Sequence, residues 1–369
     1  MKISILGLTI TSAWGNGHAT TYRSLCQALA ARGHSICFLE KNAPWYSEHR
    51  DLPAPSFCEV TLYGHWHEAA PWLAETVTGS DLIIVGSYFP DGIAAAQHLF
   101  EHARCPIFFY DIDTPVTVER LREEGETEAI RAIDIPRYDA YLSFTGGPIL
   151  DELKARFGAQ RALPLYCSVD PLLHQPRPNN PRFECALSYL GTYSADRQPK
   201  LEEMFVSPAL QLPENRFLLA GAQYPPELSW PSNVWRFEHI PPAEHSSFYC
   251  SSRFTLNLTR DNMVAAGWSP SVRLFEAAAC GAAIISDTWP GLDELLTPGK
   301  EILLAAGSLD ILRILRETTE SQRQALGAAA RARILREHTS AQRAAELEGI
   351  ALSIPAKSTA NSVAEHARH

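Results

Sequence analysis

Residues 269–301 read SPSVRLFEAAACGAAIISDTWPGLDELLTPGKE, and this stretch decides the fold class. Ser269 followed by Pro270 is typical of a helix start, because serine caps free N–H groups and proline fills a position whose N–H has no partner. Apolar residues then recur at helical spacing up to Gly281, a residue suited to the left-handed turn that ends a helix. The apolar run 282–286 predicts a strand, and a turn and a second apolar run follow. Helix, strand, short helix and strand make up half of a nucleotide-binding α/β unit.

Two charged residues, Arg273 and Glu276, interrupt the apolar character of this predicted helix. Because they are three residues apart, they lie on one face of the helix. A diphosphate can bind at a helix N-terminus, where N–H groups are free and the partial charge is positive. Glu276 lies six residues beyond Pro270, about 9 Å along the axis at about 1.5 Å per residue. This distance suits the diphosphate and the ribose of one nucleotide; the alternative is a surface ion pair between Arg273 and Glu276.

The run RLFEAAACGAAIISDTWPGLDELLTPGKEILL, residues 273–304, resembles the C-terminal domain of group 1 glycosyltransferases of the GT-B fold. Within that group it is most similar to the CgeB-like (spore maturation protein B) branch, in which Arg-x-x-Glu-Ala followed by Cys-Gly is typical. The wider family carries a Glu-x7-Glu pair whose second Glu contacts the donor ribose, and Glu276 matches this second Glu. The position of the first is occupied by Trp268, so the chain departs from the family pattern there.

The composition narrows the class of protein. With 369 residues, the chain is too long for one ordinary core and suits two domains. Its net charge of −10 argues against nucleic acid as a partner, so an anionic ligand has to be held by a few well-placed cations. No apolar run is long enough for a transmembrane segment, and the N-terminal one is too short for a signal peptide. The eight cysteines are scattered without a C-x-x-C pair, which favours reduced thiols. We therefore expect a cytoplasmic globular protein.

Strands and helices alternate along the first half of the chain, which predicts a doubly wound parallel sheet. The loop after the first predicted strand reads TSAWGNGH, residues 11–18. Gly15 and Gly17 allow a ligand to approach the backbone closely at this end of the strand. In GT-B enzymes this loop faces the cleft between the domains. The resemblance therefore makes His18 a candidate contact for the acceptor or the donor sugar, and the alternative is an exposed or capping histidine.

Two aspartates, Asp111 and Asp113, follow the predicted strand 106–110 at the end where α/β sheets place their ligands. Asp113 precedes Thr-Pro and fits a helix N-cap. Asp111 has no such structural role and is the better candidate for catalysis. His65 and His67 suggest a metal site, but no second cluster of ligands is visible in the sequence, and we expect no metal.

A proline-rich stretch, 169–182, divides the chain. Its first part, VDPLLHQP, resembles the segment with which group 1 glycosyltransferases leave their first domain. We expect an N-terminal, acceptor-side Rossmann-like domain over 1–170 and a C-terminal, nucleotide-sugar-binding Rossmann-like domain over 171–337. As in GT-B folds, a C-terminal helix at about 338–352 is expected to pack back on the first domain. Residues 357–369 are polar, and we expect them to be disordered.

The second domain opens with a predicted strand and the loop GTYSADRQPK, residues 191–200. Gly191, Arg197 and Lys200 resemble the glycine loop whose basic residues take the donor diphosphate. An Arg fork suits two phosphate oxygens, whereas Lys acts as a point charge; for both residues the alternative is ordinary surface charge. Arg260 follows another predicted strand near the cleft and is a candidate phosphate or sugar contact. Gly291, in the turn Trp-Pro-Gly, completes the candidate donor-binding set.

Together these features predict an α/β protein of the GT-B fold, with two doubly wound Rossmann-like domains facing a cleft. The resemblance implies a glycosyltransferase that moves a hexose-type sugar from a nucleoside diphosphate sugar to a sugar, lipid, small-molecule or protein acceptor. It further implies retention of the anomeric configuration, and we expect no metal or other cofactor. The candidate catalytic residues are His18, Asp111, Arg197 and Arg273.

Two alternatives share the predicted fold. A nucleotide-sugar 2-epimerase would keep donor binding and release a modified nucleotide sugar without an acceptor. A non-catalytic sugar- or nucleotide-binding protein is favoured by the missing first Glu at Trp268. The residues leave the base, the sugar, the acceptor and the oligomeric state open.

Overall fold

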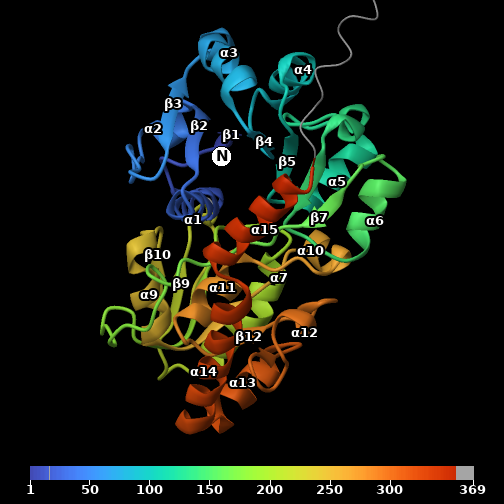
Figure 1. Ribbon diagram of the computed structural model, residues 1–369. Helices are drawn as coiled ribbons and strands as arrows, with labels where there is room; N and C mark the ends of the chain where they lie inside the picture. The colour runs from blue at the N-terminus through green and yellow to red at the C-terminus, as the bar shows by residue number, and fades with distance from the viewer. Residues whose placement is uncertain (16, 355–369) are drawn as a thin grey trace, which may run out of the picture.

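The computed structural model describes residues 1–15 and 17–354, which form two α/β units, each built on one parallel sheet (Figure 1). In that view the first unit, in blue and green, lies above the second, in yellow and orange. The tail that we expect to be disordered, 357–369, lies outside the described residues.

The first sheet has seven parallel strands in the order β3-β2-β1-β4-β5-β6-β7. Its strands are β1 (Lys2–Leu6), β2 (Ser35–Lys41), β3 (Glu59–Tyr63), β4 (Leu82–Gly86), β5 (Ile107–Asp111), β6 (Ala140–Ser143) and β7 (Ala162–Pro164). Its helices are α1 (His18–Ala31), α2 (Pro44–Ser47), α3 (Ala70–Gly79), α4 (Gly92–His102), α5 (Thr114–Glu123) and α6 (Pro148–Ala155), with short helical turns η1 (Trp66–Ala69) and η2 (Ala132–Arg137). Every residue of β4 and β5 is buried, because helices cover both faces of the sheet. The strand order reverses between β1 and β4, which opens a crevice at their carboxyl ends.

The second sheet repeats this design with six parallel strands in the order β10-β9-β8-β11-β12-β13. Its strands are β8 (Cys185–Leu190), β9 (Phe217–Ala220), β10 (Val234–Phe237), β11 (Ser252–Asn257), β12 (Ile284–Ser286) and β13 (Leu303–Leu304). Its helices are α7 (Gln198–Leu201), η3 (Glu202–Val206), α8 (Ser207–Gln211), α9 (Pro242–Ser251), α10 (Asp261–Ala266), α11 (Val272–Ala279), α12 (Leu292–Leu295), α13 (Ser308–Glu317) and α14 (Glu320–Glu337). The order reverses between β8 and β11. The prediction of two doubly wound α/β units is confirmed.

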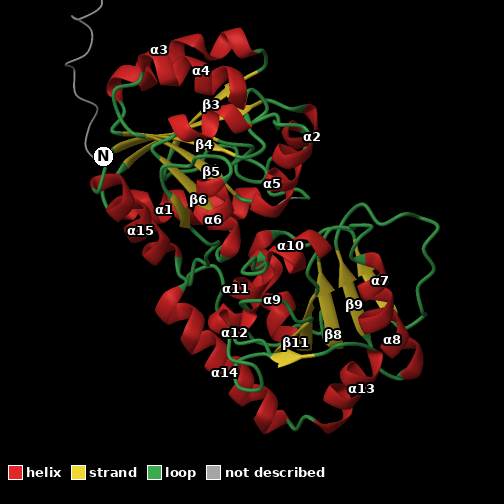
Figure 2. Ribbon diagram, turned by 90° about the vertical axis from the view of Figure 1, so that its right-hand side faces the viewer, coloured by secondary structure: helices red, strands yellow, loops and turns green. Residues whose placement is uncertain are grey.

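The last described helix, α15 (Ser340–Leu352), leaves the second unit and packs against α1 of the first (Figure 2). A capping box starts it, since the Thr339 side chain accepts from the Gln342 N–H and the Gln342 side chain accepts from the Thr339 N–H. Apolar residues of α15, among them Ala344 and Leu347, join a buried cluster that runs through both units. One hydrophobic core therefore spans the junction.

The helix α11 begins two residues later than the sequence predicts. Its N-cap is Ser271, and Ser269 and Pro270 precede the helix. The Ser271 hydroxyl donates to Asn257 Oδ1 at 2.7 Å and does not cap the helix. The end of the helix agrees with the prediction, because Gly281 adopts φ of +74° just beyond it.

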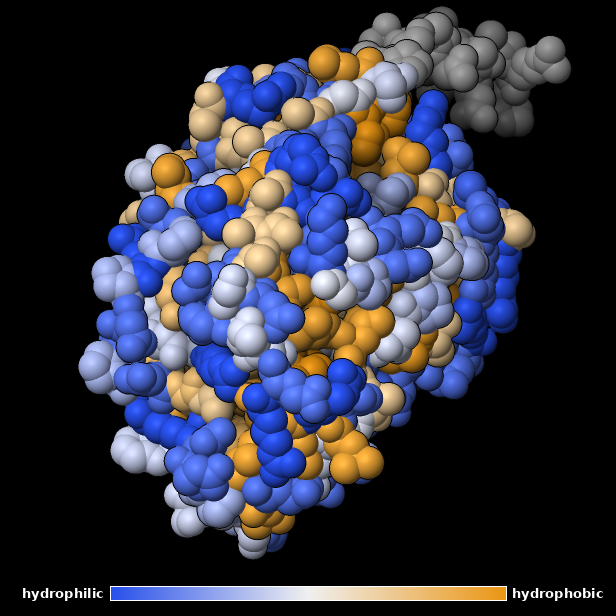
Figure 3. All heavy atoms as spheres, turned by 90° about the horizontal axis from the view of Figure 1, so that it is seen from below, coloured by the Kyte–Doolittle hydropathy of each residue, from blue (hydrophilic) through white to orange (hydrophobic). Residues whose placement is uncertain are grey.

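Polar side chains cover most of the face formed by the second unit, and apolar side chains are interspersed between them (Figure 3). No helix in the described ranges is both long enough and apolar enough to span a bilayer.

His338 lies at the junction between α14 and α15 and leads to a first prediction. Its Nδ1 is hydrogen-bonded to the Arg343 guanidinium. Burial and then the Arg343 charge lower the pKa of His338 to about 3. Because the unfolded chain takes up this proton near pH 6.5, the free energy of unfolding falls as the pH drops below that value, by about 2 kcal/mol at pH 5 for this group alone. We expect His338→Gln, which keeps an acceptor for Arg343, to remove that part of the pH dependence in denaturant titrations at pH 7 and pH 5. An unchanged pH dependence in the variant would contradict this assignment.

Candidate functional site

A cavity of about 280 Å³ lies between the two units, at the carboxyl ends of the second sheet. Leu190 and Gly191 line it at the end of β8, and Gly221 lines it after β9. Among its described residues, the first unit contributes four to the lining, from the loop after β1 and the start of α1, namely Ala13, Gly15, Gly17 and Thr20. The cavity thus occupies the place where doubly wound sheets bind ligands, and Gly15 and Gly17 are brought to it as the sequence predicts.

Arg273 is a buried and firmly held cation on the wall of this cavity, with 8% of its surface exposed. Its Nη1 donates to Asn257 Oδ1 at 2.8 Å, and its Nε donates to the Leu190 carbonyl. The guanidinium also lies 4.9 Å from the centre of the Tyr189 ring. These bonds fix the guanidinium before any ligand arrives, which is the arrangement that favours stabilisation of a developing negative charge.

Glu276 lines the same cavity and faces two histidines. Its Oε1 lies 3.6 Å from His174 Nε2, and its Oε2 lies 3.3 Å from His245 Nδ1. Tyr249 donates to Oε2 at 3.3 Å. Burial alone would raise the pKa of Glu276, but the two histidines and the tyrosine lower it to about 2. The carboxylate is therefore ionised throughout the neutral pH range and can accept hydrogen bonds from hydroxyl groups.

The alternative of a surface ion pair between Arg273 and Glu276 is wrong. Both side chains are buried, and among the described residues no salt bridge joins them, because the guanidinium points to Asn257 and Leu190.

Three ionisable side chains at or beside this cavity are close enough to one another to bind a metal ion together. His174, His245 and Glu276 each offer a ligand atom, and these atoms lie within 4.8 Å of one another. The burial of His174 lowers its pKa; burial also opposes the charged form of His245, but the Glu276 carboxylate raises the pKa of His245 above its ordinary value. His65 and His67, the pair that suggested a metal in the sequence, stack on each other away from this group.

The glycine loop after β8 brings one of its two basic residues to the cavity. Arg197 lines the wall, and its Nη2 donates to the Thr192 carbonyl at 2.6 Å. Lys200 is not among the lining residues: its ammonium group donates to the Thr259 carbonyl at 2.8 Å and pairs with Asp261 at 3.0 Å. This carboxylate and this carbonyl already hold the ammonium group, so the structure gives no support to the predicted contact of Lys200 with the donor, which stays a prediction.

Arg260 and Asp113 form an ion pair between the two units. Arg260 Nη1 lies 3.5 Å from Asp113 Oδ2, and its Nε lies 3.6 Å from Asp196 Oδ2. Asp113 occupies the N-cap position of α5, as predicted, but its side chain accepts from Tyr88 at 3.0 Å and makes no capping hydrogen bond. Burial raises the pKa of Asp113 although the Arg260 charge opposes this effect. Arg260 does not line the cavity, and the structure places it in a contact between the units.

Two of the predicted catalytic residues lie outside the cavity lining. Asp111 is fully buried at the end of β5, where it accepts from the hydroxyl groups of Tyr141 and Thr117, and burial raises its pKa to about 6. Because the side chain is enclosed within the first unit, the structure gives no support to its expected role at the reacting sugar, which stays a prediction. His18 starts α1 with its ring edge-on to Tyr88 at 5.2 Å, and burial lowers its pKa to about 4.

Trp268 occupies the position of the missing first Glu and joins the two units. Its N–H donates to the Pro290 carbonyl at 2.6 Å, and its carbonyl accepts from the Gly146 N–H at 2.9 Å. The indole lies against Gly147 of the first unit and Gly291 of the second, and a Cβ on either glycine would come within 2.5 Å of a ring atom. Gly291 is absent from the cavity lining. Gly291 makes room for this indole, and its predicted contact with the donor stays a prediction.

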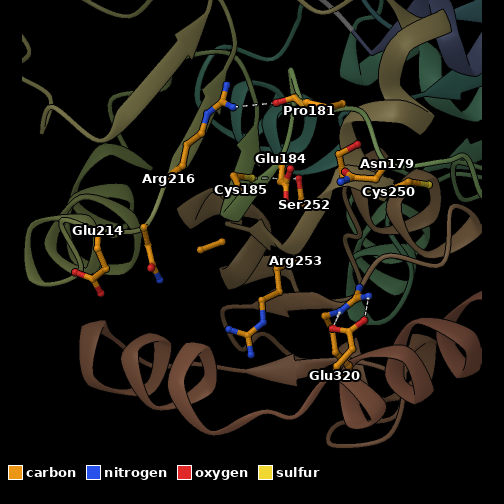
Figure 4. A pocket seen from close by; sticks show the side chains of 14 residues that line it. Asn179, Pro181, Glu184, Cys185, Glu214, Arg216, Cys250, Ser252, Arg253 and Glu320 are labelled. Carbon is orange, nitrogen blue, oxygen red and sulfur yellow. Dashed lines mark hydrogen bonds and ion pairs between the residues drawn. The ribbon is translucent and has the colours of Figure 1, made fainter.

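A larger cavity, of about 750 Å³, lies at the opposite edge of the second sheet, where Cys185 and Ser252 begin β8 and β11 (Figure 4). Its arginines are already occupied. Arg216 donates to the Pro181 carbonyl, and Arg253 donates to the carbonyls of Leu315 and Thr318. The smaller cavity is the better candidate site, because it combines a held guanidinium with an ionised carboxylate at the ligand-binding edge of the sheet.

The sequence reasoning missed four residues of the site, namely His174, His245, Tyr249 and Asn257. His245 and Tyr249 are four residues apart on α9, so both face α11, and this spacing was the available signal. His174 comes from the proline-rich joint, where nothing in the sequence sets it apart.

Comparison with known proteins agrees with this geometry. Residues 197–349 match the family model described as "Glycosyl transferase-like". No curated protein sequence matches the chain. Sucrose-phosphate synthase from Thermosynechococcus elongatus has a similar structure, with a TM-score of 0.69 and 16% identity over 95% of this chain and 98% of that one. Anabaena HepE in complex with UDP-glucose gives a TM-score of 0.65 and 15% identity over 96% and 100% of the two chains. An α-glucosyltransferase in complex with UDP and a 13-mer DNA gives 0.68 and 12% over 95% and 99%.

The predicted GT-B fold is therefore confirmed. The glycosyl transferase-like match over 197–349 includes residues 273–304, whose sequence resembles group 1 glycosyltransferases.

The packing of Trp268 leads to a second prediction. Gly291 and Gly299 both have positive φ, of +85° and +75°, but a Cβ on Gly299 would meet nothing within 4 Å. Gly299→Ala should cost roughly 1–2 kcal/mol of unfolding free energy for the left-handed backbone alone. Gly291→Ala should cost a further 1–3 kcal/mol, because the methyl group displaces the indole. Denaturant titration of both variants measures the difference, and equal losses would show that the indole does not depend on Gly291.

Proposed function

We propose that the protein is a glycosyltransferase that moves a hexose-type sugar from a nucleoside diphosphate sugar to an acceptor bound between the two units. One observation carries this proposal: Arg273 and Glu276, on one turn of α11, both line the cavity at the ligand-binding edge of the second sheet. The glycosyltransferase-like match over 197–349 supports the class of reaction.

In the proposed complex Glu276 accepts hydrogen bonds from the two ribose hydroxyl groups, and Arg273 and Arg197 hold the diphosphate. Glu276 is ionised, and Arg273 is fixed by Asn257, so neither has to reorganise when the donor binds. We propose the first unit, 1–170, as the acceptor side, because its glycine loop forms the opposite wall of the cavity.

UDP-glucose is the first donor to test. HepE was solved with UDP-glucose, and the α-glucosyltransferase was solved with UDP. The spacing Arg-x-x-Glu-Ala and Cys-Gly over 273–281 supports a place in the CgeB-like branch. We further propose a cytoplasmic location and an acceptor other than nucleic acid, the latter in keeping with the net charge of −10.

The proposed transfer retains the anomeric configuration and needs no metal. The bond between the anomeric carbon and the β-phosphate oxygen breaks, and the new bond to the acceptor oxygen forms on the same face of the sugar. The departing phosphate oxygen takes the proton of the acceptor hydroxyl. Arg273 and Arg197 stabilise the charge that develops on the diphosphate. In metal-dependent enzymes a divalent cation has this role.

A second candidate function is non-catalytic binding of a nucleotide or sugar, favoured by Trp268 in place of the first Glu of the family pair. Separation of the nucleotide products of UDP-glucose, with and without a cell extract as the source of acceptor, distinguishes these functions, because UDP and a modified nucleotide sugar are different products. A transferase needs the extract, a 2-epimerase converts the donor without it, and a binding protein turns over in neither case.

The role of Glu276 gives a third prediction. Glu276→Gln removes the charge that accepts the ribose hydroxyl groups, so nucleoside diphosphate binding should weaken by about 1.5–3 kcal/mol, roughly a 10- to 150-fold rise in Kd. Glu294→Gln, an exposed carboxylate on α12, is the matched control and should leave Kd unchanged. Isothermal titration calorimetry measures both, with thermal unfolding to verify the fold. An unchanged Kd for Glu276→Gln would remove it from the donor site.

The stereochemistry gives a fourth prediction. We expect product with the anomeric configuration of the donor, read by proton NMR before mutarotation. Arg273→Ala should lower kcat by about 100- to 1,000-fold, as loss of one stabilising donor does in other enzymes. His18→Ala should cost less, because the low pKa of His18 makes it a weak base. An inverted product together with an inactive His18→Ala enzyme would instead make His18 the general base.

A further inference from the structure

We propose that His174, His245 and Glu276 bind a divalent transition-metal ion of the zinc class, at a site that overlaps the place of the donor ribose. Metal and nucleotide would then exclude each other, and free zinc would act as an inhibitor. The metal site itself stands on the geometry of three side chains; its overlap with ribose rests on the function proposed above.

The orientation of His245 is the first support. Its Nε2 lies 3.1 Å from the Ile240 carbonyl, which can only accept, so Nε2 carries a proton. Its Nδ1 is buried, forms no hydrogen bond within the described part of the chain and lies 3.3 Å from Glu276 Oε2. A nitrogen lone pair facing a carboxylate needs a cation between them, either a proton or a metal ion. Histidines that bind metals commonly donate their other ring N–H to a carbonyl in this way.

His174 supplies the second imidazole from a different part of the chain. It is 1% exposed, and neither ring nitrogen has a hydrogen-bond partner among residues 1–15 and 17–354. Its backbone is fixed, because the His174 N–H donates to the Asp170 carbonyl at 2.8 Å and the neighbouring Leu173 carbonyl accepts from Ser246 at 2.7 Å. A buried imidazole without a partner is costly, and a bond from Nε2 to a metal would satisfy it.

The spacing of the ligand atoms fits a small ion. Bonds of about 2.0–2.1 Å in tetrahedral geometry place ligand atoms about 3.4 Å apart. The separations from Glu276 to the two imidazoles are 3.3 and 3.6 Å, and all three ligand atoms lie within 4.8 Å of one another. Two imidazoles with one carboxylate suit zinc, cobalt or nickel, whereas Mg²⁺ and Ca²⁺ prefer oxygen ligands throughout.

The surroundings leave the metal position accessible. Arg273, three residues from Glu276, is held by Asn257 and Leu190, so it does not neutralise the carboxylate. Glu276 and His245 both line the cavity, so the fourth position of a tetrahedral ion would face the space proposed for ribose. The competing reading is a proton shared between the carboxylate and the imidazoles, with no affinity for metal.

A titration with metal alone separates the two readings. Protein is freed of metal with EDTA, dialysed, and titrated with ZnCl₂ by calorimetry and with CoCl₂ by visible absorption. We expect one ion per chain and a Kd that rises at least 10-fold in His174→Asn and in His245→Asn. The matched control replaces both His65 and His67 with Asn and should bind as the unaltered chain does. Thermal unfolding shows which variants keep their fold. Absence of binding, or equal binding by the histidine-site variants, would overturn the metal site.

The overlap with ribose is tested separately. Free zinc is held constant with a metal buffer, so that chelation by the nucleotide does not contribute. The nucleoside diphosphate that gives the largest thermal shift is then titrated in. We expect its apparent Kd to rise with free zinc in the unaltered chain and not in His174→Asn. If metal binds but nucleotide affinity does not respond, the metal site stands and the overlap is wrong. If no nucleotide binds at all, the proposed function fails while the metal titration still decides the site.

Discussion

The side chain of Asn257, at the carboxyl end of β11, is the interaction on which the candidate site depends. Its Oδ1 accepts from Arg273 and from Ser271, and its Nδ2 donates to Ser286 at the end of β12. One buried amide therefore ties two neighbouring strands to the first turn of α11. The rotation of that helix about its axis is fixed, and with it the direction in which Arg273 and Glu276 face. Asn257, an uncharged residue, thus determines how the charged side chains of the cavity are oriented.

The fold and part of the site could be predicted because their signals are local. Glycine after an apolar helix, as at Gly281, and apolar runs of strand length are read from a few neighbouring residues, and they identified α11 and its strand correctly. The start of α11 was wrong because Ser271 makes its hydrogen bond to Asn257, fourteen residues away in the chain. A sequence pattern for capping cannot anticipate that competing acceptor.

The roles of residues whose partners come from distant elements could not be predicted from the sequence. Asp111 was assigned to catalysis because the carboxyl end of a strand is where ligands bind, yet Tyr141 from the neighbouring strand accounts for its carboxylate. Lys200 was assigned to the donor from its place in a glycine loop, yet its ammonium group pairs with Asp261. His174, from the segment that joins the two units, lies beside Glu276 in the candidate site. In each case the deciding contact joins residues that only the folded sheet brings together, so spacing along the chain carried no information about it.

The return of α15 to α1 has a consequence for the order in which the protein can form during synthesis. Arg32, the residue that follows α1, pairs with Glu348 of α15, 316 positions later. The ribosome releases α1 early, and the apolar residues that face α15, such as those of the cluster through both units, stay uncovered until the second unit has been made. All strands of the first sheet are synthesised long before α15, the helix that covers this part of the first unit. Vectorial synthesis thus leaves a long interval in which this apolar strip is open to chaperones or to a neighbouring nascent chain.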